Sequence, residues 1–336
     1  MSVSVIVVTW NGLHVLKDCV AALAEQTLPH ELIVVDNGSH DGTSDWLTQH
    51  APQARLVQLP HNLGFAGGNN VGLRVASGER LALLNNDTIA APDFLERLVA
   101  PLDTDQRVGA TAGVLTFAQR PELVASAGIS VGRDGLHRDR WALKPVAELP
   151  AKATPIFGAS GGAVCYRRAA LDDVGLLDDG YFAYLEDADL AWRLQLRGWR
   201  CLLAPDALVR HIYSATSGQG SPFKQRLLAR NRLRLIVRCW PDQLVERHWP
   251  TILRYDLLAA AYGLLRRQPA ILTGRLAIWS ELPALFGQRR AILRRRTART
   301  RTLEHWLERP VGVREMLAEQ RALAAVLATD HGAAAQ

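Results

Sequence analysis

Short apolar runs alternate with polar clusters over the first ninety residues of the chain. Three of the runs, Val3–Val8, Leu32–Val35 and Leu81–Leu84, have the length and continuity of buried strands. Each run stops at a polar cluster, and these clusters are Thr9 to Gly12, Asp36 to Ser39 and Asn85 to Thr88. Because ligands collect at the carboxyl ends of parallel strands, the clusters should converge on one crevice. The pattern therefore predicts an enzyme active site at that edge of a sheet.

Segments with helical spacing separate these strands. Gly12–Gln26 and Thr43–His50 are the expected helices, and Leu56–Leu59 is the next expected strand. The alternation predicts a mainly parallel sheet with helices on both faces. We interpret the following residues 62–70 as a loop whose glycines allow the backbone to approach a ligand and whose asparagines offer uncharged amide donors.

Beyond Leu115 the alternation is looser. Val131–Gly135 resembles a hairpin turn, and Phe157–Tyr166 is a run of small residues that leads into a strand. Neither the dinucleotide-binding Gly-x-Gly-x-x-Gly pattern nor the P-loop pattern occurs, so hydride transfer and ATP hydrolysis lack their usual signatures.

An aromatic stretch, Tyr181–Leu185, precedes three carboxylates at an expected helix start. One interpretation is simple helix capping together with an Asp189–Arg193 pair one turn apart. The other interpretation makes Glu186 or Asp187 a general base, because an apolar aromatic environment can hold a carboxylate ionised, poorly solvated and basic. The residues by themselves leave both interpretations open.

Composition limits the class of protein. With 336 residues, of which 48% are hydrophobic, the chain can bury a sizeable core. Its four cysteines are widely spaced, which argues against a disulfide framework or a zinc site and favours a reducing cytosol. We expect no secretory leader and no membrane-spanning helix, because the longest apolar run, Leu257–Leu265, is too short.

Charge is distributed unevenly along the chain. Residues 1–223 carry 18 Lys and Arg against 24 Asp and Glu, a net charge of −6, whereas residues 224–336 carry 21 against 9, a net charge of +12. We therefore expect a catalytic domain over 1–223, a basic amphipathic helical region over 224–305, and a C-terminal helix with a disordered tail over 306–336.

The basic region contains three expected helices, Gln225–Cys239, Thr251–Leu265 and Ile271–Leu285, followed by the arginine-rich run Arg289–Arg296. Tryptophans and arginines on amphipathic helices suit an anionic membrane surface, where each basic group adds about 1 kcal/mol. The alternative is a helical subdomain with a solvated basic face. Nucleic acid is not an expected partner, because no recognised binding module is present.

Six segments of the chain, taken together, resemble the family 2 inverting glycosyltransferases, and within them the bacterial rhamnosyltransferase-like branch. The segments are Thr9 to Asn11, Val35 to Ser39, Asn62 to Asn69, Leu84 to Asp87, Gly158 to Gly162 and Leu185 to Leu190. They fall in the expected order within residues 3–240. The resemblance implies a GT-A fold, with a mixed, mainly parallel sheet between helices, a C-terminal helical extension, a sugar-nucleotide donor and a divalent metal, Mg²⁺ or Mn²⁺.

The resemblance also implies roles for single residues. Those near the nucleotide and donor sugar are Thr9, Asn11, Asp36, Asn37, Asn62, Gly64, Asn69, Asn85 and Asn86. Asp36 matches the acid that reads the pyrimidine or the ribose. Asn85 to Asp87 matches the metal motif usually written Asp-x-Asp, in which Asp87 is the retained carboxylate and Asn85 is a departure from the fuller pattern. With one carboxylate, metal affinity should depend on oxygens of the donor diphosphate.

A histidine and two acids complete the implied site. A lone histidine such as His211 is more often structural than a ligand, but the resemblance makes it a second metal ligand. The family's base falls on the second acid of the Glu186-Asp187 pair, so Asp187 is the expected base. Glu186 could hold the acceptor instead.

The expected reaction is a single displacement at the anomeric carbon. The donor is dTDP-rhamnose or a UDP-sugar, and the acceptor is a glycan or a polyprenyl-linked glycan of a cell-surface polysaccharide. The enzyme is expected in the cytoplasm, peripheral on the inner face of the membrane, with a homo-oligomer also considered.

Three alternatives remain at this point. The first is transfer of a UDP-hexose or an N-acetylhexosamine by the same kind of enzyme. The second is a sugar-nucleotide-forming nucleotidyltransferase, which would need a basic glycine-rich loop after the first strand, where Thr9–Leu13 has no Lys or Arg. The third is a non-catalytic sugar-nucleotide-binding protein, which would be expected to lose Asp87 or Asp187.

Overall fold

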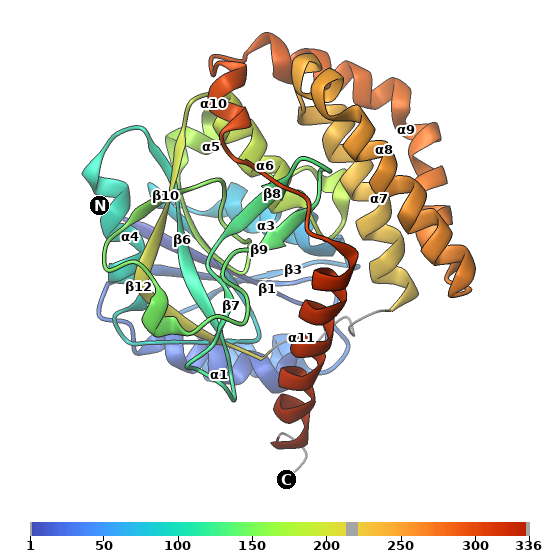
Figure 1. The fold of residues 1–336 in the computed structure, drawn as a ribbon. Coiled ribbons are helices and arrows are strands. Elements are labelled where there is room, and N and C mark those ends of the chain that lie inside the picture. The colour runs from blue at the N-terminus through green and yellow to red at the C-terminus, as the bar shows by residue number, and fades with distance from the viewer. Residues whose placement is uncertain (1, 213–220, 334–336) are drawn as a thin grey trace.

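A ten-stranded sheet forms the centre of the protein in the computed structural model, which describes residues 2–212 and 221–333 (Figure 1). Its strands are β1 (Val3–Thr9), β2 (Glu31–Asp36), β3 (Arg55–Gln58), β4 (Arg80–Asn85), β5 (Thr88–Ala90), β6 (Val108–Phe117), β7 (Val124–Ser126), β10 (Thr154–Ile156), β11 (Ala163–Arg167) and β12 (Arg200–His211). The main path runs β10-β12-β6-β11-β4-β1-β2-β3, with β5 on β12 and β7 on β6.

The sheet is mixed and mainly parallel, as the sequence predicts. β3, β2, β1 and β4 are parallel neighbours, and β6 and β12 are parallel to each other. β11 is antiparallel to both β4 and β6, so β6 runs in the same direction as β4. The carboxyl ends of β1, β2, β4, β6 and β12 therefore lie at one edge, which is where polar groups can converge.

Helices cover both faces of the sheet. They are α1 (Leu13–Ala24), α2 (Thr43–His50), α3 (Gly64–Val75), α4 (Phe94–Val99), α5 (Arg168–Val174) and α6 (Glu186–Leu196), with 3₁₀ turns η1 (Ala100–Thr104), η2 (Val146–Glu148) and η3 (Asp179–Tyr181). Leu16 of α1 and Leu95 of α4 belong to one core cluster, and Leu73 of α3 and Leu190 of α6 belong to the other. The expected helices before β2 and β3 are confirmed.

The expected loop over residues 62–70 is corrected by the structure, because most of it is the first half of α3. A Cβ atom on Gly68 would lie 2.6 Å from Cγ1 of Val8, and one on Gly72 would lie 2.4 Å from Cγ2 of Ile6. These two glycines let a helix pack closely on β1. The sequence hid this helix because its packed face is made of small residues, which carry no apolar periodicity.

A second, smaller sheet joins distant parts of the chain. It contains β8 (Ile129–Gly132), β9 (His137–Asp139) and β13 (Leu307–Glu308). β8 and β9 are antiparallel, which confirms the hairpin expected at this place. A third core cluster lies beside this sheet, and Trp192 and Trp240 contact each other there with ring centroids 5.4 Å apart.

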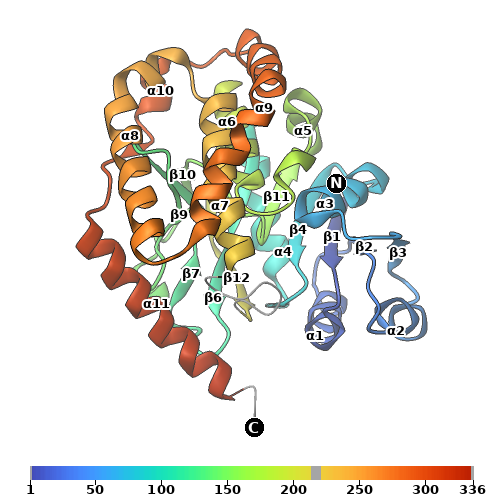
Figure 2. The same cartoon turned by 90° about the vertical axis from the view of Figure 1, so that its right-hand side faces the viewer.

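The remaining helices lie at the end of the molecule opposite to β1–β3 (Figure 2). They are α7 (Pro222–Cys239), α8 (Asp242–Leu265), α9 (Pro269–Arg294), α10 (Thr300–Glu304) and α11 (Val313–Ala333). Leu327 of α11 reaches the first core cluster. The expected disordered tail is tested only in part, because residues 334–336 lie outside the described residues.

The first of these helices, α7, is part of the catalytic region's core. Arg234 pairs with Asp178 and with Glu281, and the Arg238 guanidinium contacts Asp178 and lies 3.4 Å from the buried Asp189 carboxylate. Such buried pairs are costly to break, because either partner alone would be left as an unpaired buried charge. The boundary expected at residue 223 falls in the first turn of α7, and the three-part division stays a prediction.

Candidate active site

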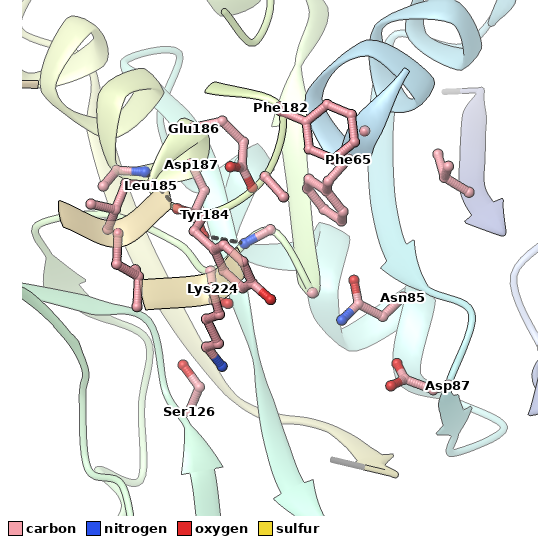
Figure 3. Close-up of a pocket in the computed structure, with 18 of the residues that line it drawn as sticks. Phe65, Asn85, Asp87, Ser126, Phe182, Tyr184, Leu185, Glu186, Asp187 and Lys224 are labelled. Atoms are coloured by element: carbon pink, nitrogen blue, oxygen red, sulfur yellow. Dashed lines mark hydrogen bonds between the residues drawn. The ribbon is translucent and has the colours of Figure 1, made fainter. Parts of the chain in front are cut away.

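A cavity of about 960 Å³ opens at the carboxyl edge of the sheet (Figure 3). We call one side the strand-end wall, and its residues are Thr9, Trp10, Asn37, Asn62, Gly64, Asn85, Asn86, Asp87 and His211. We call the other side the loop wall, and its residues are Ser126, Asp139, Phe182, Tyr184, Leu185, Glu186, Asp187, Phe223 and Lys224. The polar clusters that end β1, β2 and β4 thus contribute to one cavity, as their positions predict.

Amide side chains organise the strand-end wall. Asn86 Nδ2 donates to Thr9 Oγ1 at 2.9 Å, which ties the end of β4 to the end of β1. Asn37 Nδ2 donates to Asn62 Oδ1 at 3.0 Å, and Asn37 Oδ1 accepts from the Leu63 amide at 2.9 Å. The wall is therefore a preorganised polar surface that carries little charge of its own.

Gly64 joins the two walls. Its φ is +75°, and a Cβ atom there would lie 2.3 Å from the carbonyl oxygen of Phe182. That same carbonyl accepts a hydrogen bond of 3.1 Å from the Ala66 amide. Gly64 is required because α3 begins in direct contact with the backbone of the loop wall.

Three of the expected donor residues do not line this cavity. Asn69 is buried in α3 and donates to the Phe65 carbonyl at 2.9 Å. Asn11 accepts from the His40 amide at 2.8 Å. Asp36 accepts from the Ser39 amide at 2.9 Å and from the Ser44 hydroxyl, and it borders a separate, smaller cavity at the end of β2. Their roles near the nucleotide stay predictions.

Asp87 and His211 come together although 124 positions separate them in the sequence. His211 Nε2 lies 3.1 Å from Asp87 Oδ1 and 3.3 Å from Asn85 Nδ2. A carboxylate oxygen and an imidazole nitrogen are both ligands that Mn²⁺ accepts. In residues 2–212 and 221–333 no group of three or more His, Cys, Asp and Glu could enclose a metal ion. The pair therefore fits a cation that takes its other ligands from water or from substrate oxygens.

Asp187 is held at the start of α6 by backbone amides. Its Oδ2 accepts from the Gly161 amide at 2.9 Å and its Oδ1 accepts from the Ala188 amide at 2.7 Å. These bonds fix the carboxylate toward the cavity. A fixed carboxylate that faces a cavity can accept a proton from a bound hydroxyl group.

Burial raises the pKa values of both neighbouring acids at this helix start. Burial raises the pKa of Asp187 to about 6, although the Gly161 and Ala188 amides oppose that rise. Burial and the adjacent Asp187 charge raise the pKa of Glu186 well above its usual range. Glu186 Oε2 is buried with no hydrogen-bond partner among the described residues. The environment therefore disfavours the charged form of both acids, and backbone amides hold the Asp187 carboxylate.

The loop before these acids is strained. Phe182, Tyr184 and Leu185 have φ values of 63°, 69° and 70°, in the left-handed region that non-glycine residues rarely adopt. Each such residue costs about 1–3 kcal/mol, so the surrounding structure must hold it in place.

Asn231 of α7 holds this loop. It is fully buried, and its Nδ2 lies 3.1 Å from the Tyr181 carbonyl, 2.9 Å from that of Ala183 and 2.7 Å from that of Tyr184. Arg230 Nη2 adds a bond of 3.1 Å to the Tyr181 carbonyl. The helix that the charge pattern assigned to a separate basic region therefore positions the catalytic loop.

Sequence reasoning missed Lys224 and Asp139 of the loop wall, and also Asn231, which holds the loop from behind. Asn231 and Lys224 lie in a stretch dominated by arginines, and Asp139 lies in a segment without a recognisable motif. A polar asparagine at a core-facing helical position was the available signal for Asn231. The Asp189–Arg193 pair that the sequence did predict is present at 2.7 Å and is buried beside α7.

Comparison with known proteins gives a family that fits this site. The model of the family described as "Glycosyl transferase family 2" matches residues 4–175. The N-acetylglucosaminyl-diphospho-decaprenol L-rhamnosyltransferase of Mycobacterium tuberculosis is 27% identical over 280 residues, which cover 75% of this chain and 88% of that protein. An N-acetylglucosaminyltransferase of Mesorhizobium japonicum is 28% identical over 77% of this chain and 65% of its own length.

Solved structures with this fold include two glycosyltransferases. GalNAc-T7 with UDP, GalNAc and Mn²⁺ superposes with a TM-score of 0.60 and 17% identity, over 80% of this chain and 58% of that one. The mannosyltransferase PcManGT from Pyrobaculum calidifontis, in complex with GDP-Man and Mn²⁺, superposes with a TM-score of 0.50 and 20% identity. The match covers 87% of this chain and 86% of that one. The chain therefore belongs to glycosyl transferase family 2 and has the GT-A fold of these enzymes.

Proposed function

We propose that the protein transfers a sugar from a nucleotide diphosphate to an acceptor hydroxyl by a single displacement with inversion, and that Asp187 is the base. The observation that carries this proposal is the fixed Asp187 carboxylate, which shares one cavity with the Asp87–His211 pair. In inverting transfer a base must face the anomeric carbon from the side opposite the leaving diphosphate. The two walls of the cavity provide those two sides.

The residues of the chain have separate tasks in this reaction. Asp187 accepts the proton of the acceptor hydroxyl as that oxygen bonds to the anomeric carbon, while the bond to the diphosphate oxygen breaks. Protonated Glu186 can donate a hydrogen bond to a substrate oxygen, because its pKa is raised well above its usual range. Asp87 and His211 would hold a divalent cation, which when bound neutralises charge on the departing diphosphate.

The favoured donor is dTDP-rhamnose, with a UDP-sugar as the second candidate. The support is similarity to a relative named as an L-rhamnosyltransferase that acts on an N-acetylglucosaminyl-diphospho-decaprenol. By the same reasoning we propose a lipid-linked glycan as acceptor. The N-acetylglucosaminyltransferase relative favours a UDP-sugar instead, so the donor must be measured.

A donor panel tests the proposed function directly. The full chain is incubated with dTDP-rhamnose, UDP-sugars and GDP-sugars, with Mg²⁺, Mn²⁺ or chelator, and nucleotide release is followed with and without a lipid-linked acceptor. We expect one donor to give metal-dependent release that Asp187→Asn abolishes in the presence of acceptor. Binding of every nucleotide without release or transfer under any condition would contradict the proposal.

We also propose that the enzyme works at the inner face of the cytoplasmic membrane. Among the described residues no helix combines the length and apolarity needed to cross a bilayer. Large apolar side chains are nevertheless exposed along α8 and α9, and they are Trp249, Leu253, Leu257, Leu258, Tyr262, Leu264, Leu265, Leu276, Trp279 and Phe286. Exposed Arg254 lies on α8, and exposed Arg266 and Arg267 lie in the turn between α8 and α9, which suits an anionic lipid surface.

This surface, α8–α9, lies next to the beginning of α7, which borders the cavity. A Cβ atom on Gly274 of α9 would lie 2.4 Å from the Arg226 carbonyl of α7, so the first turns of these two helices are in contact. Phe223, in the first turn of α7, lines the cavity. An acceptor presented from a membrane at α8–α9 would therefore be close to the part of the cavity that Phe223 lines.

Vesicle binding tests this placement. We expect the full chain to sediment with anionic phospholipid vesicles, and Leu265→Ser with Trp279→Ser to weaken sedimentation without changing nucleotide release. Both side chains are largely exposed, at 84% and 69%, so the fold should tolerate the changes. Should the same substitutions dissociate a dimer in vesicle-free buffer, the surface is an interface between two copies and the membrane proposal fails.

A further inference from the structure

One part of the loop wall is charged and has no role in the mechanism above. It contains Asp139 from β9, Lys224 from α7 and Ser126 from β7, and all three line the cavity. The Lys224 ammonium lies 5.1 Å from the centroid of the Tyr184 ring. Asp139 acts electrostatically on both Lys224 and Asp187, so this group lies close to the base.

Lys224 lies apart from Asp87, whereas Asp139 is near enough to His211 to interact with it electrostatically. In Figure 3, Lys224 and Ser126 are together on the side of the cavity opposite Asn85 and Asp87, next to Tyr184. A donor diphosphate at Asp87 and His211 would be on the far side of the transferred sugar. Lys224 therefore faces the space that remains for the acceptor.

We propose that Asp139 and Lys224 form the acceptor subsite, in which Asp139 binds a hydroxyl of the acceptor sugar and Lys224 binds the phosphate that links this sugar to its lipid. The inference rests on the proposed function. It also predicts acceptor specificity, because it requires that the acceptor carry an anionic group next to its sugar.

The chemistry of the group supports this assignment. A carboxylate only accepts hydrogen bonds, which matches a sugar hydroxyl, whereas an ammonium is a point charge suited to phosphate. Burial lowers the pKa of Lys224, and Asp139 opposes this effect. A partly desolvated cation interacts more strongly with an anion than one in bulk water does.

The surroundings of Lys224 also suit a lipid-linked substrate. Phe223 precedes it in α7, is 52% exposed and packs edge-on against Phe182 with ring centroids 5.9 Å apart. Leu228, one turn further along α7, is also exposed and lines the cavity. An apolar chain that leaves the phosphate at Lys224 would thus continue over apolar side chains toward α8–α9.

Two acceptors that differ only in phosphate test the inference. One is N-acetylglucosamine linked through diphosphate to a short prenyl chain, and the other is the matching alkyl glycoside without phosphate. For Lys224→Gln we expect the acceptor KM to rise roughly tenfold with the diphosphate-linked substrate and to stay unchanged with the alkyl glycoside. For Asp139→Asn we expect a higher KM with both acceptors.

Controls separate this inference from the proposed function. Lys152→Gln removes a lysine from an exposed position outside the cavity and should change neither KM. For Lys224→Gln, nucleotide-sugar calorimetry should give the donor affinity of the unaltered chain, because this residue is proposed to contact only the acceptor. If Lys224→Gln raises the donor KM, or raises the acceptor KM equally with both acceptors, the assignment of Lys224 to the phosphate is wrong. If no donor gives release or transfer with the unaltered chain, the proposed function has failed instead.

Discussion

The strand-end wall of the cavity and the loop wall differ in where their side chains come from along the chain. Thr9 is the last residue of β1, and Asn37 and Asn86 come directly after β2 and β4. These side chains bond to one another or to the next polar cluster. On the loop wall, Asp187 depends on the Gly161 amide and on a loop held by Asn231. The first wall is thus fixed by the sheet itself, whereas the second is fixed by contacts between distant segments.

This difference predicts that the strand-end wall binds the donor and that the loop wall carries out transfer. A surface built on strand ends is rigid, which suits a donor whose diphosphate must be held in one geometry. A strained loop clamped by a helix is more sensitive to its surroundings, because local strain persists only while neighbouring contacts hold it. Substitutions in the two walls should therefore separate donor binding from transfer.

The largest expected effect is that of Asp187→Asn. An amide cannot accept the proton of the acceptor hydroxyl, so transfer should fall by about 10²–10⁴-fold, the usual contribution of a general base. Donor affinity, measured by nucleotide-sugar calorimetry, should change little. The matched comparison is Glu186→Gln, which should lose less activity than Asp187→Asn, because Glu186 is proposed to bind a substrate oxygen and not to accept the proton. A variant Asp187→Asn with near-normal transfer would rule out Asp187 as the base.

The next effect is expected on the strand-end wall. His211→Ala removes one of two proposed cation ligands, so the apparent affinity for Mn²⁺ should fall on the order of 10–100-fold. The check is a Mn²⁺ titration of donor binding. Asn85 also lies 3.3 Å from His211 Nε2, and Asn85→Asp should strengthen cation binding by adding a second carboxylate. If the dependence of donor binding on Mn²⁺ is unchanged in both variants, His211 and Asn85 do not belong to the metal site.

The pH profile of kcat/KM should show the pH at which Asp187 becomes ionised. Because burial raises the pKa of Asp187 to about 6, the ionised form is lost as the pH falls through 6. Below that pH, kcat/KM should decrease about tenfold per pH unit, and above pH 7 it should be level. An apparent pKa near 4 would mean that the acting base is a well-solvated carboxylate rather than Asp187.

A smaller effect is expected for Asn231→Ala. The change leaves the Tyr181, Ala183 and Tyr184 carbonyls without this donor, which costs about 1–3 kcal/mol for buried groups. We expect kcat to fall several-fold while donor affinity is kept, with stability followed by thermal unfolding. Arg226→Ala, at an exposed position of the same helix that does not line the cavity, serves as the control. Equal loss of donor binding and kcat would show that the two walls are not independent.

The smallest effect on function is expected for Asn69→Ala. Asn69 donates to the Phe65 carbonyl inside α3 and does not line the cavity, so the donor KM should stay within about twofold. Stability should fall by about 1 kcal/mol through the lost hydrogen bond. A large rise in donor KM at unchanged stability would restore the role that the family resemblance implies for this residue.

The order of strands and helices could be predicted over the first half of the chain because one pattern repeats there. Val3–Val8 and Leu81–Leu84 became β1 and β4 nearly as expected, since buried parallel strands are continuous apolar runs. The start of α6 at Glu186 also followed from its acids. The prediction failed at α3, where small residues pack on the sheet and leave no apolar stripe.

The sequence by itself determined the family, the mainly parallel sheet and the polar clusters at its strand ends. These are local properties, because a strand and the residues that follow it are neighbours in the chain. Only the tertiary structure decided that His211 meets Asp87, that Asn231 holds the catalytic loop, and that α7 is shared between the core and the site. Such contacts join residues far apart in sequence, and no spacing or periodicity within one segment encodes them.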